Sequence, residues 1–121
     1  MYSTVFKDHL VNPRNVGELI DASVVAEETN PVCGDRLLLY LRIVDDRIEK
    51  AQFLAYGCPP TLVCGSVLAE KLSGLSINEA DRITGKDLVS AVGGLPSRKN
   101  HAAALAIETL KTALHNRKAK S

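Results

Sequence analysis

Hydrophobic and other residues alternate in the first half of the chain. Over residues 37–43, leucine and isoleucine recur at every second position, which is the period of a β-strand, and the β-branched run at 23–28 favours a strand before it. Asp45 and Asp46 form a turn signal, after which residues 48–55 return as a third strand. We therefore expect a three-stranded antiparallel sheet, with the strands paired in chain order.

In the second half of the chain, apolar residues recur every three or four positions, which is typical of amphipathic helices. Helices are predicted over residues 5–10, 61–72, 77–83, 86–92 and 100–116. Pro59 and Pro60 suit the first turn of the helix that follows them, and Ser76 and Thr84 are candidate N-caps. The pattern predicts an α+β fold in which helices pack on the three-stranded antiparallel sheet.

Two histidines and the basic end of the chain are expected at the surface. His9 and His115 lie on predicted helices with charged neighbours, so both are predicted to be solvated. Residues 117–120 are predicted to form a frayed, solvated helix end.

Length and charge narrow the classes of function. With 121 residues, 45% of them hydrophobic, the chain is expected to form a single domain over residues 1–121. Its 15 basic and 14 acidic residues lack the excess of positive charge found in nucleic-acid-binding proteins and polybasic membrane anchors. No stretch reaches the roughly 18 apolar residues of a membrane span, and the first residues do not resemble a signal peptide, so we expect a cytoplasmic protein.

Three cysteines, an odd number, are expected to stay reduced in the cytoplasm, which favours metal ligation or thiol chemistry over disulfides. Cys33 precedes Gly34, and Cys58 follows Gly57. A glycine lets the backbone turn tightly, so each sulfur can sit on an exposed turn that a metal can approach. We therefore take Cys33 and Cys58 as candidate metal ligands.

Two further side chains belong to the same candidate site. Asp35 lies two residues after Cys33, and His101 is predicted in the first turn of the last helix. A meander would bring the turns of Cys33 and Cys58 together, giving a sulfur, oxygen and nitrogen donor set. Each residue also has a structural alternative: Asp35 as a turn cap, His101 as a partner of a backbone group, and the cysteines as small buried residues.

The chain resembles the scaffold proteins of iron-sulfur cluster assembly, the IscU type and the N-terminal domain of NifU. The resemblance rests on Asn12-Pro13-Arg14-Asn15-Val16-Gly17, Cys33-Gly34-Asp35, Tyr56-Gly57-Cys58, Leu95-Pro96 and His101. It implies an IscU/SufE-like sandwich that is not an enzyme. A cysteine desulfurase and an iron donor would build a labile [2Fe-2S] cluster on it for transfer to client apo-proteins. Zinc can occupy the same pocket in members of this family.

Carried over by position, Cys33, Asp35, Cys58 and His101 match the site residues of the family. The family has a third cysteine directly after the histidine, where this chain has Ala102. Cys64 is the candidate substitute, although it lies six positions after Cys58 along a predicted helix and is equally suited to packing in the core.

Two partner expectations follow from other segments. Members of the family have a Leu-Pro-Pro-Val-Lys segment that recruits an Hsp70-type chaperone. The matching residues 95–99 of this chain have Ser97 and Arg98 in place of the second proline and the valine, so the resemblance does not carry that contact over. Tyr2, Val5 and Phe6 leave two alternatives open, a homodimer contact or packing of the first helix on its own domain.

Three functional hypotheses remain at this point. The first is a scaffold for a labile [2Fe-2S] cluster. The second is a zinc-binding sulfur acceptor, similar to a sulfurtransferase, that works with a cysteine desulfurase. The third is a degenerate, protein-binding family member without metal. Without a thiol at position 102, sulfur would have to be accepted by Cys33 or Cys58, with Arg98 and Lys99 as nearby positive charges that lower a thiol pKa.

Overall fold

An antiparallel sheet forms the centre of the structure, a computed structural model that describes residues 2–120 except the side chains of residues 98 and 118–120. The strands are β1 (Val24–Thr29), β2 (Arg36–Val44) and β3 (Arg47–Tyr56), in the order β1-β2-β3. Leu39 in the middle strand faces Ala26 on one side and Phe53 on the other. The predicted α+β fold, with a meander paired in chain order, is therefore confirmed.

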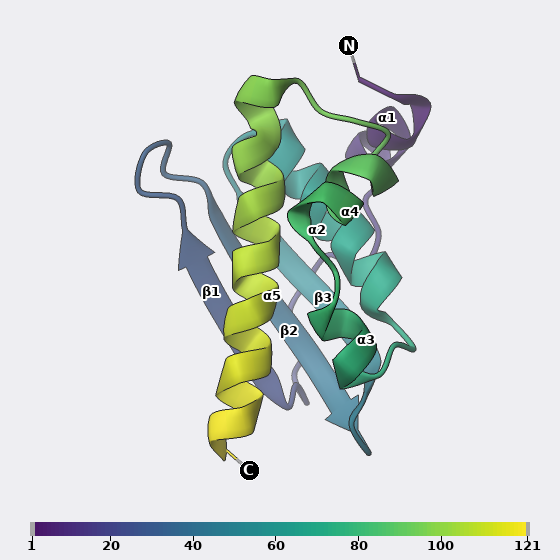
Figure 1. The fold of residues 1–121 in the computed structure, drawn as a ribbon, viewed down its shortest axis with the longest axis vertical. Coiled ribbons are helices and arrows are strands. Elements are labelled where there is room, and N and C mark those ends of the chain that lie inside the picture. Colours follow the sequence, from purple (N-terminus) through teal and green to yellow (C-terminus); the bar gives the residue numbers. More distant parts are fainter. Residues whose placement is uncertain (1, 121) are drawn as a thin grey trace.

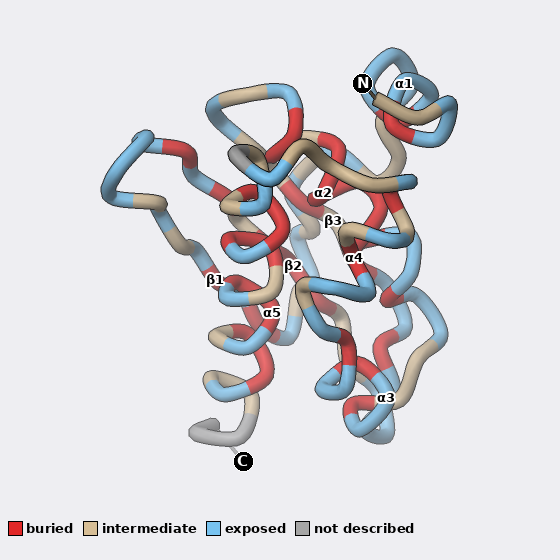
Figure 2. Tube along the Cα trace, turned by 45° about the horizontal axis from the view of Figure 1, so that its top comes forward, coloured by how far each residue is buried: buried red, intermediate tan, exposed pale blue. Residues whose placement is uncertain are grey.

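Helices cover one face of this sheet. They are α1 (Thr4–Val11), α2 (Pro59–Leu72), α3 (Ile77–Asp81), α4 (Gly85–Ala91), the short 3-10 helix η1 (Ser97–Lys99) and α5 (Asn100–Lys120). Figure 1 shows α2 and α5 side by side across the sheet, with α3 and α4 beside them. In Figure 2 the buried segments lie where these helices face the strands. None of the described helices is long and apolar enough to cross a membrane.

Helix ends follow the chemistry expected from the sequence. The second helix begins at Pro59 with both prolines in its first turn, two residues earlier than predicted. Ser76 and Thr84 are N-caps, and each is part of a capping box, with Glu79 and Asp87 respectively. The last helix continues beyond residue 116 to Lys120. Residues 117–120 were predicted to form a frayed, solvated end, but Arg117 is helical, only 24% exposed and paired with Asp46. The side chains of residues 118–120 lie outside the described part of the chain.

The first helix packs on its own domain. Phe6 is buried, and its ring stacks on Tyr2 with the ring centroids 3.9 Å apart. Val5 is the exposed member of the three apolar residues that the sequence placed here. The packing alternative therefore accounts for Tyr2 and Phe6.

Gly65 allows helix α2 to lie directly against the sheet. A Cβ atom at this position would be 2.6 Å from the Phe53 ring and 3.2 Å from Leu37 Cδ1, and both side chains are fully buried. Packed interiors yield little to an added methyl group. The close approach of α2 to β2 and β3 therefore depends on this glycine.

We expect Gly65→Ala to lower the free energy of unfolding by about 1–3 kcal/mol, because overpacking outweighs the gain of about 1 kcal/mol in helix propensity. Urea unfolding measures the change. Gly85→Ala is the matched control, since a Cβ atom there meets nothing within 4 Å. A Gly65→Ala protein as stable as the wild type would contradict the packing described here.

His9 is buried, although the sequence pattern predicted a solvated surface residue, and that prediction is wrong. Its Nδ1 lies 2.7 Å from Ser66 Oγ, and Ser66 Oγ also accepts a hydrogen bond of 2.8 Å from the Arg14 backbone N–H. Because Ser66 accepts from Arg14, its own proton is free to be donated to His9 Nδ1. Helix α1 and the segment after it are thus tied to α2. The exposed His115 agrees with the prediction made for it.

This burial makes stability depend on pH. Burial, followed by the positive charge of Arg14, lowers the pKa of His9 from its ordinary value of 6.5, against the opposing charges of Glu70 and Asp8. A histidine whose pKa is lowered by folding stabilises the protein above pH 6.5, and this contribution is lost as the pH falls below 6.5 toward the folded pKa.

We therefore expect the free energy of unfolding to fall between about pH 7.5 and 5.5, and to fall less steeply in His9→Gln. Urea unfolding across this pH range tests the expectation, with His115→Gln as the exposed control that keeps the wild-type dependence. Equal slopes for His9→Gln and the wild type would show that His9 does not carry the effect.

Candidate metal centre

Three separate segments meet at one end of the sheet. Arg36, the first residue of β2, pairs with Tyr56, the last residue of β3. This pairing places Asp35 next to Cys58, which is the N-cap of α2. The first turn of α5 reaches the same end of the molecule and brings His101 to it (Figure 1). The meander is thus the cause of the convergence that the sequence predicted.

The loop between β1 and β2 is closed by its own hydrogen bonds. Asn30 Oδ1 accepts a bond of 2.9 Å from Val32 N–H, and the Asn30 carbonyl oxygen accepts one of 2.7 Å from Gly34 N–H. Gly34 has a φ of +77°, a left-handed conformation that glycine adopts easily. The turn fixes the backbone on both sides of Cys33 and leads directly into Asp35.

The candidate ligand atoms lie close to one another. Asp35 Oδ2 lies 2.9 Å from Cys58 Sγ and 3.7 Å from His101 Nε2. Cys58 Sγ and His101 Nε2 are 3.9 Å apart. One ligand atom each of Cys33, Asp35 and His101 lie within 4.8 Å of one another. Ligands of a tetrahedral zinc are about 3.5 Å apart. Cys58 is not part of the group of three, but its sulfur contacts Asp35 and His101 at similar distances, so the four predicted side chains lie near one another at this end of the sheet.

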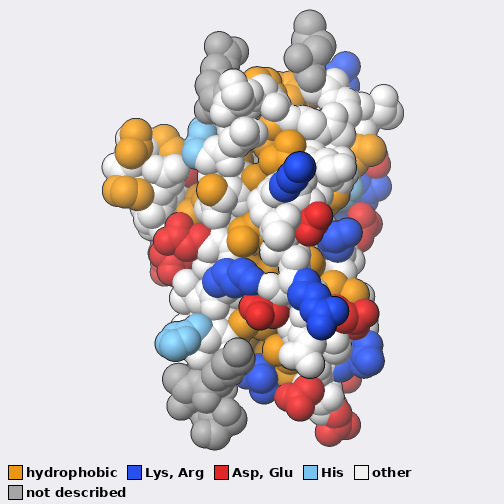
Figure 3. Space-filling view, viewed as in Figure 1, with side chains coloured by type: hydrophobic (Ala, Val, Ile, Leu, Met, Phe, Trp, Pro, Cys, Tyr) orange, Lys and Arg blue, Asp and Glu red, His pale blue; other side chains and the backbone are white. Residues whose placement is uncertain are grey.

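Exposure is graded across this candidate metal centre. The Asp35 side chain is 6% exposed and forms the base, whereas His101 is 29% exposed. Cys58 is partly buried and Cys33 is exposed. Figure 3 shows hydrophobic side chains gathered at the tip of the projecting loop between β1 and β2, where Val32 is 94% exposed. Cys33 is consequently the sulfur that another protein can reach.

Asp35 is held by hydrogen bonds to both of its oxygen atoms. Oδ1 accepts from Cys58 N–H at 3.3 Å, and Oδ2 accepts from Thr61 Oγ1 at 2.7 Å and from Cys58 Sγ. Burial raises the pKa of Asp35, but the hydrogen bonds from Cys58, Thr61 and Cys33 outweigh it, and the net pKa is lowered. The carboxylate is therefore ionised at neutral pH and available as a ligand.

Thr61 was not predicted as a site residue. It occupies the third position of α2, after two prolines, and is buried. Its hydroxyl also lies 3.6 Å from Cys58 Sγ. Its place three positions after an N-cap is one where a polar residue is common, so the sequence could have marked Thr61 as part of the helix start. Its hydrogen-bond partner, Asp35, could not be predicted because it lies in a turn far away in the sequence.

Cys64 lies in the hydrophobic core and not at the candidate metal centre. Burial, with a smaller contribution from the charge of Cys58, raises the pKa of the Cys64 thiol to about 12, so it stays protonated at neutral pH. Among the described residues, the group formed by Cys33, Asp35 and His101 includes neither Cys64 nor Cys58, but the Cys58 sulfur contacts both Asp35 and His101. Of the two alternatives left open for Cys64, its burial favours packing in the core over substitution for the third family cysteine. Ala102 cannot supply the missing ligand either, because its methyl side chain has no atom that can bind a metal.

The structure does not test whether Arg98 and Lys99 lower the pKa of a thiol at the candidate metal centre. The side chain of Arg98 lies outside the described residues. Lys99 ends η1 directly before α5, and its influence on a thiol stays a prediction.

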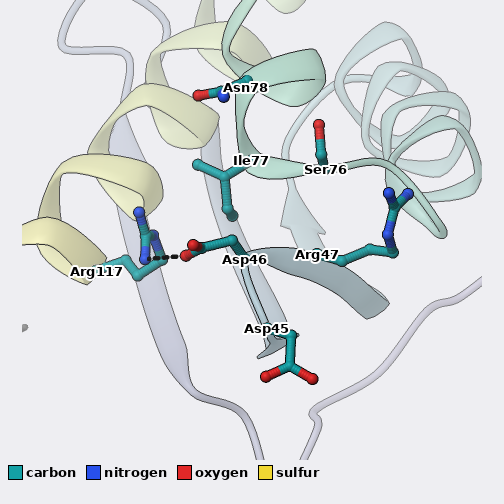
Figure 4. A pocket seen from close by; sticks show the side chains of 7 residues that line it. All are labelled: Asp45, Asp46, Arg47, Ser76, Ile77, Asn78 and Arg117. Atoms are coloured by element: carbon teal, nitrogen blue, oxygen red, sulfur yellow. Dashed lines mark hydrogen bonds and ion pairs between the residues drawn. The ribbon is translucent and has the colours of Figure 1, made fainter.

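A pocket at the opposite end of the fold has different chemistry. Figure 4 shows its lining around the turn between β2 and β3, with a volume of about 260 Å³. Arg117 Nη1 lies 3.1 Å from Asp46 Oδ1 and ties α5 to that turn. No cysteine or histidine is among the described residues that line it. This pocket therefore lacks the soft donors that iron and zinc sites use.

Known proteins resemble the chain in fold as well as in sequence. A crystal structure of a nitrogen-fixing NifU-like protein (N-terminal) from Brucella abortus matches with a TM-score of 0.83, covering 98% of this chain and 95% of that one at 14% identity. A putative scaffold protein for the SUF system from Fervidobacterium islandicum has a TM-score of 0.78, covers 93% and 96% of the two chains, and is 22% identical. At these identities the matches establish the fold.

Sequence relatives establish the family. The iron-sulfur cluster assembly scaffold protein IscU of Archaeoglobus fulgidus is 41% identical over 114 residues, which cover 94% of this chain and 74% of the relative. IscU of Aquifex aeolicus is 39% identical, covering 93% and 73%. The model of the NifU-like N terminal domain matches residues 1–121. The chain therefore belongs to the NifU-like N-terminal domain family.

Proposed function

We propose that the protein is a scaffold on which an iron-sulfur cluster is assembled and from which it is passed on. The observation that carries the proposal is the convergence of Cys33, Asp35, Cys58 and His101 at one end of the sheet. The names of relatives in Archaeoglobus fulgidus and Aquifex aeolicus, which are scaffold proteins, support the same function. The cluster is cargo that is held on the protein and then leaves it, so the proposed role is that of a carrier and assembly site.

The cargo fitted by four ligands from one chain is a [2Fe-2S] cluster, with two protein ligands for each iron. Two cysteines supply thiolates, while Asp35 and His101 supply oxygen and nitrogen. A carboxylate and an imidazole bind iron less firmly than thiolates and exchange more readily. The mixed donor set thus suits assembly followed by transfer to client apo-proteins, with ferrous iron supplied by an iron donor.

Sulfur enters, in this proposal, through Cys33. A cysteine desulfurase carries the sulfur as a persulfide. The Cys33 thiolate attacks the outer sulfur, a new S–S bond forms on Cys33, and the S–S bond of the donor breaks to leave the donor thiolate. Cys33 is the exposed cysteine, on a projecting apolar loop that a protein partner can contact.

The alternatives raised by the sequence are not favoured. A zinc-binding sulfur acceptor would use the same four residues, but the relatives at 39% and 41% identity bear the names of scaffold proteins. A degenerate, protein-binding member has no need of four convergent donors. Binding of an Hsp70-type chaperone to the 95–99 segment, and a homodimer, are predictions that this proposal does not require.

Anaerobic reconstitution with ferrous iron, cysteine, a cysteine desulfurase and excess dithiothreitol, a thiol reductant that supplies the electrons needed to turn persulfide sulfur into the sulfide of the cluster, tests the proposal. The wild type is expected to gain visible charge-transfer bands, with two irons and two sulfides per chain. Cys58→Ala should lose the bands, and Cys64→Ala, which changes a thiol in the core, should keep them. Stoichiometric zinc binding without bands in the wild type, or no metal at all, would contradict the scaffold function.

A further inference from the structure

The hydroxyl group of Thr61 has a fixed position relative to the candidate metal centre. Thr61 is 1% exposed, and its backbone N–H donates to the Cys58 carbonyl oxygen at 3.0 Å. Pro59 and Pro60 precede it in the first turn of α2, which restricts the backbone there. A β-branched side chain in a helix has few rotamers. Neither the backbone nor the side chain of Thr61 is therefore free to turn away.

That hydroxyl has one strong partner, Asp35 Oδ2, at 2.7 Å. A carboxylate oxygen has two lone pairs, and Thr61 takes one of those on Oδ2. The other is directed to the site, since Cys58 Sγ lies 2.9 Å away from the same oxygen. Cys58 N–H holds Oδ1 at 3.3 Å. Asp35 is thus fixed at both oxygens, and the Oδ2 lone pair that accepts from the Cys58 thiol becomes available to a metal once that thiol gives up its proton to bind the metal as a thiolate.

We infer that Thr61 is a positioning residue, which orients Asp35 as a metal ligand and keeps its Oδ2 pointed at the other donors. The inference rests on the proposed ligand set, but it adds a residue that does not itself bind the metal. Groups that hydrogen-bond a ligating carboxylate set its orientation, and their loss typically lowers metal affinity by about 10- to 100-fold.

Zinc alone is a suitable probe, because it needs neither the desulfurase nor an iron source. We expect Thr61→Val, which keeps the shape but removes the hydroxyl, to weaken zinc binding by about tenfold or more in competition with a chromophoric chelator. Thr61→Ser keeps the hydroxyl and should bind within about twofold of the wild type. Thermal unfolding of the metal-free proteins shows whether Thr61→Val is folded.

A double-mutant comparison separates positioning from a general packing effect. In an Asp35→Ala background there is no carboxylate to orient, so adding Thr61→Val should change zinc affinity by less than about twofold. The same tenfold loss in that background would overturn the assignment, as would wild-type affinity or tighter binding in Thr61→Val alone. If the wild type binds no zinc, the proposed ligand set fails as well, so the two failures are distinguishable.

Discussion

Gly57→Ala is expected to abolish zinc binding at the candidate metal centre while the protein stays folded. A Cβ atom on residue 57 would lie 2.1 Å from Asp35 Oδ1 and 2.5 Å from Asp35 Cγ, distances that non-bonded atoms cannot adopt. Asp35 is enclosed and must leave its place to relieve the collision. The carboxylate then loses its bonds to Cys58 and Thr61 and no longer faces His101.

Backbone strain needs its own control in this experiment. Gly57 has a φ of +135°, so alanine there is strained even without the collision. Gly74→Ala is the matched variant, because Gly74 has a φ of +90° and a Cβ atom there meets nothing within 4 Å. We expect Gly74→Ala to lose some stability but to bind zinc like the wild type. Zinc affinity that is unchanged in Gly57→Ala would contradict the placement of Asp35.

Cys33→Ser is expected to abolish sulfur transfer from a cysteine desulfurase, the second large effect. Persulfide transfer needs a thiolate that the donor persulfide can reach. Cys33 is exposed on the projecting loop, whereas Cys58 is partly buried and its sulfur lies against Asp35. Cys64 is fully buried, and its pKa of about 12 keeps the thiol protonated at neutral pH.

Intact-protein mass spectrometry after incubation with a desulfurase and cysteine measures the transfer, because a persulfide adds the mass of one sulfur atom to the protein. Cys58→Ser and Cys64→Ser are the matched controls and should accept sulfur like the wild type. Sulfur loading that survives in Cys33→Ser, or that disappears in Cys58→Ser alone, would place the acceptor at Cys58.

Much of the fold could be predicted because its signals are local. The alternation over β2, the two aspartates at the following turn and the prolines at the start of α2 each act over a few residues. His9 was misread because its partner, Ser66, lies 57 residues away in the sequence. A short helix with charged neighbours gives no sign of which polar side chain will be enclosed by another helix.

The residues of the candidate site were likewise predictable only where the sequence around them carries a local signal. Cys33, Asp35, Cys58 and His101 were predicted because glycine turns and the helix start mark them locally, and the strand order then implies that they meet. Which face of α2 carries Cys64, by contrast, is decided by packing of α2 on the sheet and α5. Thr61 could not be assigned to Asp35 for a similar reason, since the hydrogen bond joins residues 26 positions apart.

X-ray absorption spectroscopy of the zinc-loaded protein tests the central claim, that these four side chains from distant segments surround one metal. We expect a four-coordinate zinc with two sulfur ligands at about 2.3 Å and two nitrogen or oxygen ligands at about 2.0–2.1 Å. The sulfur count should fall to one in either Cys33→Ser or Cys58→Ser and stay at two in Cys64→Ser. A zinc with no sulfur ligands, or one that loses a sulfur in Cys64→Ser, would contradict it.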